Sequence, residues 1–134
     1  MNEQTILVVI ATRSISLADG LAALLRAIPQ IEKVEIVGSM EDAMQRVEDI
    51  KPRVLLLDLA MAGKQPKTLL ERITLLSPET LRVVLVDDTQ DVGANPQFVE
   101  AVLVKGTSPS AVITILNNLL FSRGVKTDSY LSEA

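Results

Sequence analysis

Five short aliphatic runs, separated by longer stretches with helical periodicity, constrain the fold of this 134-residue chain more than any other feature. Each run has four or five residues, is rich in Val, Ile and Leu, and is largely uninterrupted by polar residues. Continuous aliphatic strands of this kind are typical of a parallel sheet that helices cover on both faces. The five runs are ILVVI (6–10), VEIVG (34–38), VLLLD (54–58), VVLVD (83–87) and AVLVK (101–105).

The stretches between the runs place their apolar residues at helical spacing and carry helix-boundary signals. Ser39 followed by Asp42 has the S-x-x-D spacing that caps a helix N-terminus. Ser108 precedes Pro109, and proline suits the first position of a helix because the N–H that it lacks has no helical partner there. We therefore predict helices over residues 14–28, 40–50, 67–76 and 109–122.

The alternation of strands and helices predicts an α/β fold: a three-layer, flavodoxin-like, doubly wound parallel sheet of five strands in the order 2-1-3-4-5. The fourth helix is expected to be abbreviated, because DTQDVGANPQFVE (88–100) leaves room for only a turn or two. We expect one domain over residues 1–123. Residues 124–134 lack a sustained apolar stripe and are expected to be a linker or tail that leads to an effector.

The composition excludes several classes of function. The chain has no histidine and no cysteine, so disulfides, thiolate chemistry and a Ser-His-Asp mechanism are excluded. Its net charge of −4, with no cluster of Lys and Arg, argues against direct nucleic-acid binding. No phosphate-binding glycine motif follows a predicted strand, so we expect no enzyme activity. The N-terminus lacks the basic region of a signal peptide and no apolar run is long enough to cross a membrane, which predicts a cytoplasmic protein.

Charged residues end three of the five aliphatic runs. Asp58 ends the third run, Asp87 the fourth and Lys105 the fifth. Because the carboxyl ends of parallel strands meet at one edge of the sheet, we expect these three side chains to lie together. A strand that is otherwise buried tolerates a charge where it emerges, and a neighbouring lysine compensates a carboxylate there. The simplest interpretation is an ion pair between Asp58 and Lys105.

The runs and their flanking residues resemble the receiver domain of two-component response regulators, most closely the subfamily that precedes helix-turn-helix DNA-binding domains. In that family, the aspartate that ends the third strand accepts a phosphoryl group from a histidine kinase, and a lysine that ends the fifth strand pairs with that group. The resemblance places these roles on Asp58 and Lys105. It covers residues 5–122 and is carried by VEIVG (34–38), KPRVLLLDLAMAG (51–63), RVVLV (82–86) and AVLVKGTSPS (101–110).

The chain departs from the family pattern at three positions. Two acidic residues that hold Mg²⁺ follow the first strand in the family, whereas this chain has IATR at 10–13. Asp87 stands at the switch position where the family has Thr or Ser, and Val102 replaces an aromatic residue. Mg²⁺ is usually held by one or two carboxylates with phosphate and water, so Asp58 alone is a poor anchor. We therefore expect no cofactor and weak Mg²⁺ binding.

These departures lead to a functional hypothesis. Arg13 follows the first strand and is a candidate charge partner for Asp58 or Asp87, in place of the metal. The chain is then a degenerate receiver that acts as a protein-interaction or dimerisation module and regulates an attached effector, with a protein partner or a second copy in a homodimer. One alternative is a functional phosphoacceptor that receives its phosphoryl group on Asp58 from a histidine kinase. Another is the receiver-like leading domain of a pilus-assembly ATPase.

Overall fold

The computed structural model describes residues 6–88 and 98–121, and within these ranges all five predicted strands form one parallel sheet. The strand order is β2-β1-β3-β4-β5, as predicted. The strands are β1 (Ile6–Ala11), β2 (Ile31–Val37), β3 (Val54–Asp58), β4 (Leu81–Val86) and β5 (Ala101–Val104). The helices are α1 (Ile15–Arg26), α2 (Met40–Ile50), the 3₁₀ helix η1 (Leu59–Ala62), α3 (Pro66–Leu76) and α4 (Pro109–Phe121).

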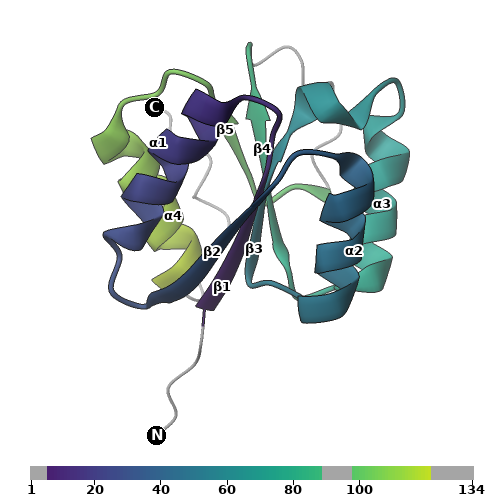
Figure 1. Ribbon diagram of the computed structural model, residues 1–134, viewed down its shortest axis with the longest axis horizontal. Helices are drawn as coiled ribbons and strands as arrows, with labels where there is room; N and C mark the ends of the chain where they lie inside the picture. Colours follow the sequence, from purple (N-terminus) through teal and green to yellow (C-terminus); the bar gives the residue numbers. More distant parts are fainter. Residues whose placement is uncertain (1–5, 89–97, 122–134) are drawn as a thin grey trace, which may run out of the picture.

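Helices cover both faces of the sheet and divide the core into two layers. Helices α1 and α4 lie on one face, and α2 and α3 lie on the other (Figure 1). Strand β3 lies in the middle of the sheet, and all five of its residues are buried. This position explains the continuous aliphatic run at 54–58, because alternate residues of β3 enter the two layers of the core.

The capping contacts confirm two of the predicted helix starts. The Ser39 hydroxyl accepts a hydrogen bond from the Asp42 N–H at 3.1 Å, and Ser108 accepts one from Ala111 at 3.4 Å. Helix α4 begins at Pro109, as expected. Helix α1 ends at Arg26, two residues before the predicted end. The N–H groups of the next two residues bond carbonyls only three residues back, which tightens the chain into a turn.

The prediction for the second strand was wrong in its bounds. Strand β2 begins at Ile31, three residues before the predicted start. It is an edge strand, so one of its two sides lacks a neighbouring strand and several of its residues are exposed. Charged residues such as Glu32 and Lys33 therefore interrupt its aliphatic pattern. A search for continuous apolar runs therefore shortens β2, and it also misses the first two residues of β4, Leu81 and Arg82.

Two further predictions lie outside the described residues. The abbreviated fourth helix was expected within residues 88–100, of which 89–97 are not described, and the tail was expected over residues 124–134. In the part of the chain that is described, no helix has both the length and the apolar character that spanning a bilayer requires.

Candidate functional site

Asp58 lies at the carboxyl end of β3, in the middle of the sheet, and its side chain is only 6% exposed. The strand turns directly into the 3₁₀ helix η1, and Asp58 caps that helix. Its Oδ1 accepts a hydrogen bond from the Ala60 N–H at 3.1 Å. The charge that ends the aliphatic run is therefore buried and used locally to begin a helical turn.

Lys105 follows β5 and reaches across β4 to the same carboxylate. Its Nζ lies 2.8 Å from Asp58 Oδ1 and 3.3 Å from Asp87 Oδ1. Its backbone N–H donates to the Val86 carbonyl at 2.8 Å, which extends the pairing of β4 with β5 by one residue. Asp87 differs from Asp58 in that its side chain is 74% exposed. The structure thus brings Asp58, Asp87 and Lys105 together at the carboxyl ends of the strands.

Thr12 is a member of this cluster that the sequence analysis missed. Its hydroxyl donates to Asp58 Oδ2 at 2.7 Å, and the residue is buried. Ala11 pairs in register with Leu57, so the residue after β1 lies opposite the residue that ends β3. This neighbourhood follows from the predicted strand order. The Thr12 hydroxyl carries no charge, so a comparison of residues 10–13 with the acidic pair of the family does not single it out.

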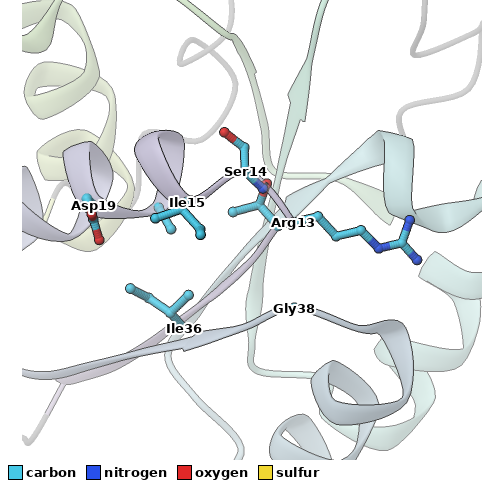
Figure 2. A pocket seen from close by; sticks show the side chains of 8 residues that line it. Arg13, Ser14, Ile15, Asp19, Ile36 and Gly38 are labelled. Carbon is cyan, nitrogen blue, oxygen red and sulfur yellow. The ribbon is translucent and has the colours of Figure 1, made fainter.

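The structure does not bring Arg13 to the cluster, so the expected pairing with a carboxylate was wrong. Among the residues described here, Arg13 makes no ion pair with Asp58 or Asp87. The inward position belongs to Thr12, and the Ser14 N–H donates to the Thr12 hydroxyl at 3.1 Å, which closes a turn. In Figure 2 the Arg13 side chain extends away from Ile15 and Asp19. It is exposed to solvent.

The surroundings of Asp58 favour its charged form. Burial is the largest single influence and by itself raises the pKa of Asp58. The hydrogen bonds from Lys105, Thr12 and the Ala60 N–H outweigh it together, so the pKa of Asp58 lies below its ordinary value. Burial likewise lowers the pKa of Lys105, but pairing with Asp58 and Asp87 reverses this effect and raises its pKa overall. The pair is therefore ionised at neutral pH.

The donor set around Asp58 does not fit Mg²⁺. Octahedral Mg²⁺ takes oxygen ligands, usually carboxylates together with water and phosphate. Here the groups that contact Asp58 are a hydroxyl, a backbone N–H and an ammonium group, all of which donate to it. Within residues 6–88 and 98–121, no group of three or more acidic side chains is arranged to hold a metal ion.

A shallow pocket lies beside the cluster, between the start of α1 and the end of β2 (Figure 2). Its volume is about 300 Å³, and Thr12 forms part of its wall. Two large aliphatic side chains in its lining are open to solvent: Ile15 is 78% exposed and Ile36 is 43% exposed. Exposed aliphatic groups that are gathered at one place are typical of a surface that contacts another molecule.

Comparisons with known proteins give matches at the level of structure. No family model matches this sequence, and no curated protein matches it. The isolated receiver domain of RcsB from Salmonella enterica serovar Typhimurium, in the presence of phosphomimetic BeF₃⁻, matches with a TM-score of 0.70 at 20% identity, over 87% of this chain and 89% of that one. A CheY-like receiver domain from Methylobacillus flagellatus matches with a TM-score of 0.75 at 16% identity, over 87% and 99%.

One of the matches is to a chain longer than this one. RcsB, in a structure of dimers bound to DNA, matches with a TM-score of 0.77 at 20% identity. The match covers 94% of this chain but 66% of that one, so the chain spans about two thirds of its length. At these identities the likeness establishes the fold. The chain therefore has the fold of the CheY-like receiver domains of response regulators.

Proposed function

We propose that this chain is a receiver-type signalling domain that works without phosphorylation, as a protein-interaction module that regulates an attached effector. The receiver fold supports the signalling role, and RcsB dimers bound to DNA offer a precedent for a domain of this fold within a longer regulator. The observation that carries the proposal is the state of Asp58. Its carboxylate is buried and already accepts hydrogen bonds from Thr12, Ala60 and Lys105.

Transfer of a phosphoryl group to Asp58 brings negative charges together, and cations normally offset that repulsion. The cation in contact with Asp58 is Lys105, which it shares with Asp87. Asp87, which is 74% exposed, adds a further negative charge beside this lysine. With no set of acidic ligands for a metal in the described part of the chain, this charge balance disfavours the transfer.

The exposed pair Ile15 and Ile36 supports an interaction role, because it offers apolar surface beside the site. The occupants that we propose are a protein partner, the attached effector or a second copy of the chain. The competing function is that of a phosphoacceptor in a histidine-to-aspartate relay. The observation in its favour is the 2.8 Å contact between Asp58 and Lys105, since that lysine is placed to pair with a phosphoryl group.

Incubation with acetyl phosphate and Mg²⁺, followed by intact-mass measurement, separates the two functions. We expect no stoichiometric gain of a phosphoryl group, while a receiver domain known to react serves as the positive control. The Asp58→Asn variant identifies any modification at another position. A full gain in the natural chain that disappears in this variant establishes the relay function and refutes the proposal.

A further inference from the structure

We propose that Thr12 is a positioning residue that, together with Lys105, holds the Asp58 carboxylate in one closed arrangement and keeps it from reacting with a phosphoryl donor or binding a cation. This inference rests on the proposed function for the assignment of Asp58 as the centre of the site. It concerns a residue that neither the sequence pattern nor the structural matches single out.

The first argument is that both oxygens of the Asp58 carboxylate are occupied. Oδ1 accepts from the Ala60 N–H and from Lys105, at 3.1 and 2.8 Å. Oδ2 accepts from the Thr12 hydroxyl at 2.7 Å. Thr12 therefore covers the oxygen that Lys105 leaves uncovered. A hydrogen bond from a neutral hydroxyl to a carboxylate is charge-assisted and stronger than one between neutral groups.

The second argument is that the Thr12 hydroxyl is itself fixed in direction. The Ser14 N–H donates to the hydroxyl oxygen at 3.1 Å, and Ser14 in turn caps helix α1. The backbone N–H of Thr12 donates to the Val37 carbonyl at 3.1 Å, at the end of β2. Because the hydroxyl oxygen already accepts one bond, its single proton is directed to Asp58. The start of α1 and the end of β2 thus both determine where the carboxylate lies.

The third argument is the charge of the cluster. Lys105 is the charged side chain that contacts Asp58 in the described structure, and Asp87 interacts with it through Lys105. Within the described residues, Arg13 forms no ion pair with Asp58 or with Asp87. The Thr12 hydroxyl stabilises the ionised carboxylate as an uncharged donor. Because it adds no second negative charge, position 12 offers no charged ligand to a divalent cation.

The test compares Thr12→Val, which keeps the shape and removes the hydroxyl, with Thr12→Ser, which keeps the hydroxyl. Carbon-detected NMR titration of the Asp58 carboxyl group gives its pKa in each protein. We expect Thr12→Val to raise the Asp58 pKa by about one unit, and Thr12→Ser to leave it nearly unchanged. Equal pKa values in Thr12→Val and the natural chain refute the inference.

A stability measurement distinguishes positioning from packing. An aspartate with a lowered pKa in the folded state contributes stability above its unfolded pKa and loses it as the pH falls through the folded pKa. The destabilisation of Thr12→Val is therefore largest at pH 7 and shrinks as the pH falls below about 4. Thr74→Val is the matched control, because the Thr74 hydroxyl donates to the neutral Leu70 carbonyl and its loss has the same effect at every pH.

The proposed function and the proposed role of Thr12 can be refuted independently of each other. The titration uses no phosphoryl donor, so an unchanged Asp58 pKa refutes the role of Thr12 whatever the acetyl phosphate experiment gives. If Thr12→Val is too unstable to titrate, Thr12→Ala and Thr12→Ser form the comparison. A pH-independent loss of stability in both the position-12 and the position-74 variants also refutes the role, because packing alone then accounts for Thr12.

Discussion

The guanidinium of Arg82 is a buried charged group near the amino ends of the strands, at the opposite end of the sheet from Asp58. It lies near the amino end of β4 and is 7% exposed. It donates to the carbonyls of Phe98 and Thr80 at 2.7 and 2.9 Å and to the Glu100 carboxylate at 2.8 Å. Glu100 also accepts the Arg82 backbone N–H at 2.6 Å. A charge buried this deeply is tolerated because several of its donors are used.

Glu100→Ala is expected to lower the free energy of unfolding by about 2 kcal/mol, because it leaves the Arg82 charge buried without its partner. The matched control is Glu35→Ala, which removes a carboxylate that Arg46 binds through two nitrogens. The Arg46 side chain is 32% exposed and solvent screens its charge, so this second change is expected to cost less than the first. Urea unfolding of both variants checks the ranking. Equal losses in the two proteins contradict it.

At the scale of elements, β5 illustrates how a short edge strand is held in register. It has four residues, and an ion pair lies immediately beyond each end: Arg82 with Glu100 before it, and Lys105 with Asp58 after it. Gly106 then turns the chain toward α4 with a φ of +93°. A one-residue slip of β5 breaks both ion pairs, so the charges specify a register that four residues alone specify weakly.

Gly106→Ala is expected to destabilise the protein by about 1 kcal/mol, because a residue with a side chain is strained at positive φ. Gly20→Ala is the matched control. A Cβ meets no atom within 4 Å at either position, but Gly20 lies within α1. Alanine there is expected to add about 0.5–1 kcal/mol of stability. Thermal or urea unfolding of the two variants checks the opposite signs, and a shared sign contradicts the assignment of strain to position 106.

Sequence reasoning succeeded for central elements and failed where side chains compete for one position. The strand order followed from β/α alternation, and β3 matched its aliphatic run residue for residue, because a strand buried on both faces carries an uninterrupted pattern. Strand β2 was shortened because its exposed residues are charged. Arg13 was predicted and Thr12 was missed, because a charge pattern does not show which of two successive residues turns inward.

At the scale of the whole molecule, the cluster joins parts of the chain that are far apart in sequence. Thr12 follows β1, Asp58 ends β3, Asp87 follows β4 and Lys105 follows β5. The sheet also separates two hydrophobic layers, so the cluster lies where both layers end. The predicted topology alone brings Asp58, Asp87 and Lys105 together, since the carboxyl ends of parallel strands meet on the same side of the sheet.

Lys105→Met is expected to lower the free energy of unfolding by about 2 kcal/mol at pH 7, because it leaves Asp58 without its cation. The contribution of Asp58, whose pKa is lowered, is lost as the pH falls below its ordinary value of 3.8. The contribution of Lys105, whose pKa is raised, is lost as the pH rises above the ordinary lysine pKa of 10.5. The deficit of the variant is thus constant around neutral pH. A deficit that changes with pH near neutrality contradicts the pairing.

Lys105 crosses over β4 to reach the central strand, and this contact bears on how the sheet opens. The outermost strand of a sheet usually frays first, and amide hydrogens there exchange early. Here the end of β5 cannot lift away without releasing a carboxylate two strands inward. Local opening at the end of β5 therefore disturbs the central strand of the sheet as well. A molecule that binds the end of β5 also affects Asp58.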